Sequence, residues 1–86
     1  MEDYTLDPKK MGLLIKLKRE ALGLSPYDLG RLIDISANNI YQWEKGQSMH
    51  LGQWLKVKKV LKITDDEAYN LDKSINELWQ ETNPLN

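Results

Sequence analysis

The stretch that decides the fold is SPYDLGRLIDISANNIYQWEKG, residues 25–46, which contains two helix starts separated by a very short turn. The first start combines Ser25 as N-cap, Pro26 at the first helical position and Asp28 three residues after the serine. Proline costs no hydrogen bond there, because the backbone N–H at that position has no acceptor within the helix. We therefore expect a helix over residues 26–33.

The second helix of this stretch follows after a very short turn. Asp34 lies where the turn requires left-handed backbone, which Asp tolerates better than most residues that have a side chain. Ser36 then caps a helix that we expect to run through residue 45 and to stop at Gly46. The apolar spacing predicts the inward side chains of the two helices to be Leu29, Leu32, Ile33, Ile40 and Trp43.

The rest of the chain carries the same kind of signals and no internal repeat. Asp7 and Pro8 start a helix that ends at Gly23. Thr64 and Glu67 form a capping box that opens the last helix. The sequence therefore predicts an all-α fold, a compact bundle of about five short helices. We expect these helices over 8–22, 26–33, 37–45, about 50–62 and 65–82, with Asn83 and Pro84 ending the last one.

The length of 86 residues bounds the domain organisation. It is enough for one compact domain with an economical core and too short for two. We therefore expect a single domain over 1–86. Its parts are a core over 8–63, an additional amphipathic C-terminal helix over 64–82, and tails over 1–6 and 83–86.

Charge is segregated along the chain, although the formal net charge is only −1. Residues 1–8 carry a net charge of −3, residues 9–62 of +7 and residues 63–86 of −5. The two capped helices therefore lie in a basic body between acidic ends, which favours attraction to phosphate. Ordinary solvated helix faces are the alternative explanation of these charges.

Composition argues against catalytic, metal-binding and secreted classes. The chain has no cysteine and a single histidine, His50, so the sequence indicates no metal-ligand cluster. No spacing of serine, histidine and aspartate indicates a catalytic triad, and the acidic N-terminus leads into no long apolar run. We expect a cytoplasmic, non-enzymatic protein with no catalytic residue, no cofactor, no metal and no membrane partner.

The helix expected over 8–22 carries a second apolar row beyond the stripe that a four-helix core needs. This row consists of Leu13, Leu17, Ala21 and Leu24. The last helix carries a matching stripe of Leu71, Ile75, Leu78 and Trp79. Apolar rows need a cover, so the stripe folds over the row within one chain, which we prefer, or both surfaces are buried against another chain.

A spaced pattern extends from about Met11 to Ile63. It consists of Gly12, Ile15, Arg19, Gly23-Leu24-Ser25, Leu29, Ile33, Ile35-Ser36, Ile40 and Trp43-Glu44-x-Gly46. The pattern resembles the helix-turn-helix domain of the Cro, phage-repressor and Xre family of bacterial and phage regulators. The resemblance implies a lambda-repressor-like fold that places the helix over 37–45 in a DNA major groove.

The resemblance also implies an ion pair between Arg19 of the first helix and Glu44 near the end of the recognition helix. It implies that this pair is largely buried and structural. Burying both charges offsets much of their attraction, whereas removing one partner strands the other. We expect its role to be positional.

Three positions depart from the family pattern. Pro26 replaces a glutamine that often touches phosphate, so that contact is lost. Gly30 replaces an alanine, which permits close helix approach but weakens the helix by roughly 1 kcal/mol. Asp34 replaces the usual turn glycine.

The outward face of the helix over 37–45 is expected to contact DNA. Asn and Gln side chains make bidentate contacts to adenine, and an alanine methyl contacts the thymine methyl. Tyr41 is expected to pack against a sugar or a thymine methyl, whereas a merely solvated polar face is the alternative. By resemblance, the base-reading positions are Ala37, Asn38 and Gln42, and the positions near phosphate are Ser25, Ser36, Asn39 and Lys45.

These residues predict a sequence-specific transcriptional regulator, a repressor, that binds double-stranded DNA. We expect a homodimer, because one recognition helix reads few base pairs. The competing hypothesis is a protein-interaction module that reuses the fold, as an antitoxin, an anti-repressor or a modulator of another regulator. The acidic C-terminal region and the near-zero net charge motivate it, and a toxin, another repressor or polymerase would be the partner.

Overall fold

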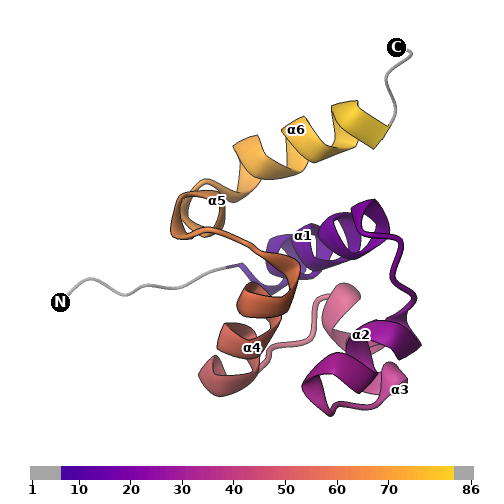
Figure 1. Cartoon of the computed structure of the whole chain (residues 1–86). Helices are drawn as coiled ribbons and strands as arrows, with labels where there is room; N and C mark the ends of the chain where they lie inside the picture. The colour runs from indigo at the N-terminus through magenta and orange to yellow at the C-terminus, as the bar shows by residue number, and fades with distance from the viewer. Residues whose placement is uncertain (1–6, 83–86) are drawn as a thin grey trace, which may run out of the picture.

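Six helices make up the computed structural model, which describes residues 7–82 (Figure 1). The expected tails over 1–6 and 83–86, and the expected stop at Asn83 and Pro84, lie outside the described residues. The all-α prediction is confirmed. The helices are α1 (Pro8–Ala21), α2 (Pro26–Ile33), α3 (Ala37–Glu44), α4 (Leu51–Leu61), α5 (Asp65–Tyr69) and α6 (Leu71–Thr82).

Side-chain caps start four of these helices at the predicted residues. Asp7 accepts from the backbone N–H of Lys9 at the start of α1, and Ser36 accepts from Asn39 at the start of α3. The starts of α2 and α5 are full capping boxes, in which a serine or threonine and an acidic residue satisfy each other's backbone N–H. The caps therefore account for where the helices begin.

The turn between α2 and α3 is left-handed at Asp34, where φ is 61°, as predicted. The backbone also comes very close to itself there. A Cβ on Gly30 would lie 2.2 Å from the carbonyl oxygen of Ile35, so only glycine fits without a shift. Glycine at this position of α2 thus has a steric cause, and it makes the turn tight.

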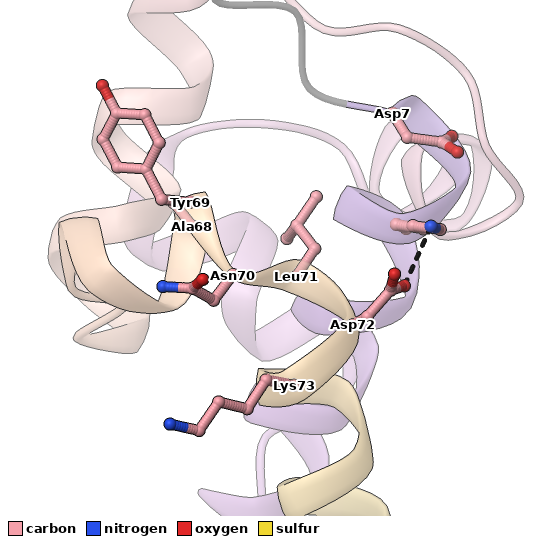
Figure 2. A pocket seen from close by; sticks show the side chains of 8 residues that line it. Asp7, Ala68, Tyr69, Asn70, Leu71, Asp72 and Lys73 are labelled. Atoms are coloured by element: carbon pink, nitrogen blue, oxygen red, sulfur yellow. Dashed lines mark ion pairs between the residues drawn. The ribbon is translucent and has the colours of Figure 1, made fainter.

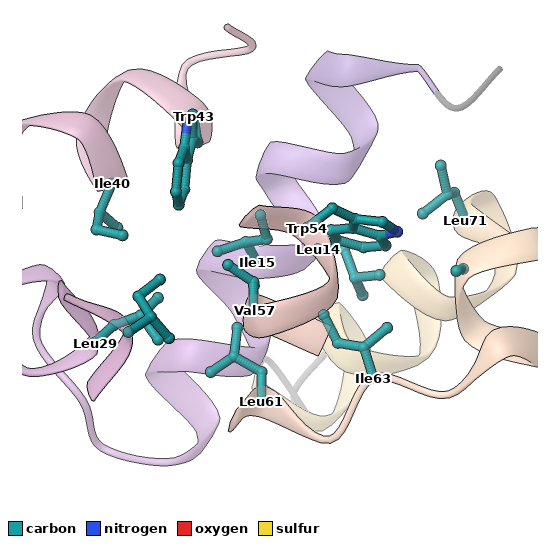
Figure 3. Packing of buried hydrophobic residues seen from close by; sticks show 12 residues of the cluster. Leu14, Ile15, Leu29, Ile40, Trp43, Trp54, Val57, Leu61, Ile63 and Leu71 are labelled. Carbon is teal, nitrogen blue, oxygen red and sulfur yellow. The ribbon is translucent and has the colours of Figure 1, made fainter. Parts of the chain in front are cut away.

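Every helix contributes to one apolar core (Figure 3). Helix α1 lies at its centre, with α2, α3 and α4 packed around one side and α6 across another (Figure 1). Burial removes this surface from water and supplies most of the stability. The buried members are Leu14, Ile15, Leu29, Ile33, Ile40, Trp43, Trp54, Val57, Leu61, Ile63, Ala68 and Leu71.

Leu32 was expected to face inward, and that expectation is wrong. Its side chain is 60% exposed, because Leu29 and Ile33, four residues apart, already fill the buried face of the short helix α2. Leu32 instead lines a shallow hollow between α2 and α4.

The expectation of one continuous helix over 65–82 is also wrong. The chain breaks at Asn70, where φ is −115° and ψ is 59°, between α5 and α6. Side chains compensate the interruption: Asn70 donates to the carbonyl of Asp66, and the Ser74 hydroxyl donates to the carbonyl of Glu67. The break redirects the chain so that α6 lies across α1 (Figure 1).

Helix α6 covers α1 within the same chain. Leu17 is buried beneath it, and Lys10 of α1 pairs with Asp72 at 2.8 Å (Figure 2). Lys18 of α1 reaches Glu67 of α5 at 2.7 Å. Cover of the row is partial, since Leu13 is 40% exposed.

Trp79 was expected in the stripe that covers α1, but its side chain is 56% exposed. Ile75 and Leu78 are half-buried and pack against the core. The cover is therefore formed by the first two turns of α6 more than by its end. Within residues 7–82, no helix is both long and apolar enough to cross a membrane.

Candidate nucleic-acid interface

Helix α3 is fixed to the core by two side chains, Ile40 and Trp43, which are almost completely buried. With 3.6 residues per turn, positions 37, 38, 41, 42 and 45 fall on the face opposite to them. The predicted contact residues of α3 are therefore brought together on one outward surface, which we call the reading face. The reading face consists of Ala37, Asn38, Tyr41, Gln42 and Lys45.

The members of the reading face differ in exposure. Asn38, Tyr41 and Lys45 are exposed, whereas Ala37 and Gln42 are half-buried. Lys45 is the C-cap rather than the last helical residue, because α3 ends at Glu44. Asn39 is exposed on the flank of the helix, about 60° around the axis from Gln42.

The two serines predicted near phosphate occupy the N-caps of α2 and α3. The hydroxyl of Ser25 accepts from the N–H of Asp28 at 3.0 Å, and that of Ser36 accepts from Asn39 at 3.2 Å. An accepting hydroxyl keeps its own proton, so both serines still have a donor for an anion. The backbone N–H of Ser25 in turn holds the pKa of Asp28 below its ordinary value.

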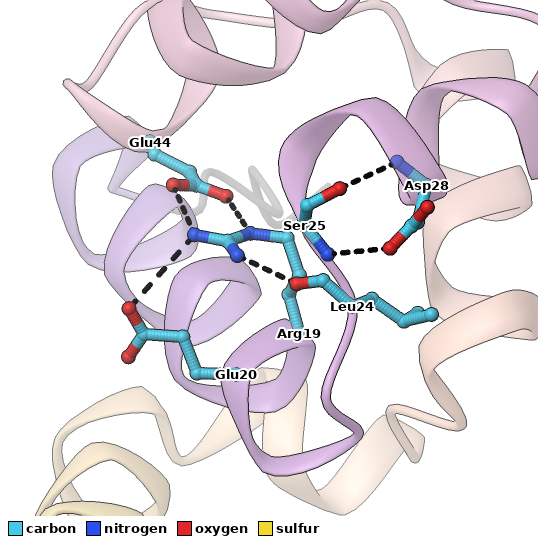
Figure 4. Close-up of polar contacts among 6 residues, drawn as sticks. All are labelled: Arg19, Glu20, Leu24, Ser25, Asp28 and Glu44. Carbon is cyan, nitrogen blue, oxygen red and sulfur yellow. Dashed lines mark hydrogen bonds and ion pairs between the residues drawn. The ribbon is translucent and has the colours of Figure 1, made fainter.

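An ion pair ties the end of α3 to α1 (Figure 4). Arg19 donates from Nε to Glu44 at 2.7 Å and from a terminal nitrogen to the second carboxylate oxygen at 3.1 Å. Its other terminal nitrogen donates to the carbonyl of Leu24 at 2.7 Å. The side chains of Arg19 and Glu44 are only 8% and 7% exposed, and the hydrogen bond raises the pKa of the guanidinium. This is the bidentate geometry that fixes orientation as well as charge.

Backbone packing reinforces the same junction. Gly12 of α1 lies so close to the end of α3 that a Cβ there would be 2.1 Å from the carbonyl oxygen of Trp43. Helix α3 is thus held at its core face, at its C-terminal end and by the tight turn at its start. The reading face is presented by a helix with little freedom to move relative to α1.

The sequence analysis did not single out Tyr27 and Arg31 of α2. In the structure the Arg31 guanidinium carbon lies 5.9 Å from the centroid of the Tyr27 ring. Both side chains border a hollow beside the start of α3, which Ser36 and Ala37 also line. The available signal was their spacing of four residues on a predicted helix, which places an aromatic ring and a cation on one face.

Comparison with known proteins agrees with this geometry. Searches of curated proteins and of solved structures gave no significant match. A family model described as helix-turn-helix matches residues 15–67, more than half of the chain and the whole of α2, α3 and α4. The chain therefore belongs to the helix-turn-helix family of the Xre, Cro and lambda-repressor type, a family of DNA-binding regulators.

Proposed function

We propose that the protein is a sequence-specific, non-enzymatic transcriptional regulator that binds double-stranded DNA in the cytoplasm and acts as a repressor. The observation that carries the proposal is the reading face of α3, which presents two amides and an alanine methyl outward from a helix held rigidly against α1. Helix α3 has about the width that a B-DNA major groove of about 12 Å admits.

Asn38 and Gln42 lie one turn apart and are proposed to read base edges. Each side chain offers an acceptor and a donor, which matches the N6 and N7 edge of adenine. Ala37 is proposed to contact a thymine methyl, and Tyr41 a sugar or another methyl. Lys45 follows at the end of the helix, where a cation meets the phosphate backbone.

Phosphate contacts are proposed at the helix starts on either side of the reading face. Ser25, Ser36 and Asn39 supply hydroxyl, amide and backbone donors there. These contacts carry no sequence information but fix how the recognition helix enters the groove.

A homodimer is proposed to complete the binding unit. One copy of α3 contacts few base pairs, and a two-fold dimer places two such helices about one helical turn of DNA apart. The operator should then be a near-palindrome with a fixed spacing between its halves.

Selection of bound sequences from a random duplex pool, followed by titration of the selected duplex at several salt concentrations, tests the proposal. We expect enrichment of a palindromic motif and an affinity that falls steeply with added salt, because bound phosphates release counterions. The proposal is wrong if no duplex binds at low salt.

The acidic surface of α5 and α6 favours the second candidate, a protein-interaction module. Asp65, Asp66, Asp72, Glu77 and Glu81 are all exposed on these two helices. Failure of every duplex to bind, together with a monomeric protein, would support this candidate, with a toxin, another repressor or polymerase as the partner.

A further inference from the structure

A hollow of about 270 Å³ opens between α2 and the first turn of α3. Tyr27 and Arg31 border it on the α2 side, and Ser36 and Ala37 border it on the α3 side. Ala37 also belongs to the reading face. The hollow is therefore continuous with the surface proposed to enter the major groove.

Arg31 carries a positive charge at the edge of this hollow. Its guanidinium stacks on the Tyr27 ring one helical turn earlier, with 5.9 Å between the guanidinium carbon and the ring centroid. Among residues 7–82, every ion pair found involves other cations, so no carboxylate neutralises Arg31. The stack restricts the rotamers of the long side chain without satisfying its N–H donors.

The start of α2 offers little of its own to a phosphate. Pro26 has no backbone N–H, and the Asp28 carboxylate occupies the N–H of Ser25. A cation one turn further along α2 is the nearest replacement for these donors. When α3 lies in the groove, atoms beside its first turn face the sugar-phosphate backbone.

We propose that Arg31, oriented by the Tyr27 ring, binds a backbone phosphate of the DNA duplex in this hollow. The inference rests on the proposed function and adds to it the contact that sets how α3 enters the groove. Asp34 lines the same hollow and repels an anion, so the phosphate lies on the side of Arg31. A planar guanidinium with paired donors suits a phosphate better than an ammonium does.

The test is the salt dependence of affinity for the duplex selected with the unaltered protein. Arg31→Ala should reduce the slope of log affinity against log salt by about 0.9, the value for one released phosphate contact. It should weaken binding to the selected and to a scrambled duplex by a similar factor, because the contact reads no base. Tyr27→Leu should keep the slope and weaken binding about two- to five-fold, since only the stack is lost.

Lys73→Ala is the matched control, because Lys73 is an exposed cation on α6, at the other end of the molecule from α2 and α3 (Figure 1). It should leave the slope unchanged, and thermal melting should show that each variant is folded. An unchanged slope in Arg31→Ala overturns this inference and leaves the proposed function standing. Failure of the unaltered protein to bind any duplex overturns the proposed function itself.

Discussion

Replacing Glu44 with alanine leaves the Arg19 guanidinium without its carboxylate in a site where the arginine side chain is only 8% exposed. Two of the hydrogen bonds of Arg19 disappear, at 2.7 Å and 3.1 Å. The bond to the carbonyl of Leu24 remains, and Glu20 is no substitute, because its nearest oxygen is 3.9 Å away and its side chain is 46% exposed. The variant therefore buries a charge that is only partly compensated.

Removal of one partner from a buried pair costs about 3–5 kcal/mol. The surviving bond to Leu24 places the expected loss in the free energy of unfolding near the lower end, about 3 kcal/mol. For a domain of this size each kcal/mol shifts Tm by about 4–8 °C, so melting should fall by at least about 12 °C. The cost falls on the junction that orients α3 and hence on the reading face.

Urea unfolding followed by circular dichroism measures this loss, with thermal melting as a second readout. Glu20→Ala is the matched control and should change the free energy of unfolding by less than about 0.5 kcal/mol, as for an exposed pair. The double variant Arg19→Met, Glu44→Leu should be more stable than Glu44→Ala, because no buried charge is left unpaired. A melting temperature of Glu44→Ala within a few degrees of the unaltered protein would refute the reasoning.

Two further predictions concern the turn and the C-terminal cover. Gly30→Ala should destabilise the fold by about 1–3 kcal/mol in urea unfolding, because its Cβ would overlap the carbonyl oxygen of Ile35; Gly52→Ala, which meets no atom within 4 Å, should not destabilise, and equal behaviour of the two would contradict the steric argument. Burial opposes ionisation of Glu67, but hydrogen bonds from Lys18 and from the capping box outweigh it and hold the pKa of this carboxyl below its ordinary value. Its contribution to stability is therefore present above the ordinary pKa of about 4.3 and is lost as the pH falls through the lower folded value. In a series of unfolding curves from pH 7 to pH 3, Glu67→Gln should lose less stability than the unaltered protein, and parallel profiles would argue against the contribution.

Local chemistry made the helix starts and the central turn predictable. Ser25, Ser36 and Thr64 cap helices because a short polar side chain reaches an unsatisfied backbone N–H within its own turn. Asp34 was identifiable for the same reason, since left-handed backbone at a helix end is a local requirement. The inward positions Ile40 and Trp43 followed from helical periodicity.

The errors arise where tertiary packing decides. Nothing in the apolar spacing from Ala68 to Leu71 distinguishes a continuous helix from one broken at Asn70, because the break serves the direction that α6 takes across α1. Leu32 has the right residue type for the core, but a helix of eight residues has room for only two apolar side chains against it.

The reading face shows the same division. Its residues could be predicted, because Ile40 and Trp43 fix which side of α3 is buried. The hollow beside it could not, since it requires the distance between α2 and the start of α3, which the tight approach at Gly30 determines. Sequence alone gives no such distance.

The central claim is that the amides of α3 read bases, and the most direct measurement is the affinity of Gln42→Ala for the selected duplex and for a scrambled one. Loss of a bidentate base contact should weaken binding to the selected duplex by about 1–3 kcal/mol and change binding to the scrambled duplex little. Gln80→Ala, an exposed glutamine on α6, is the matched control and should change neither affinity. Equal losses by Gln42→Ala on both duplexes, or no loss on either, would contradict the account.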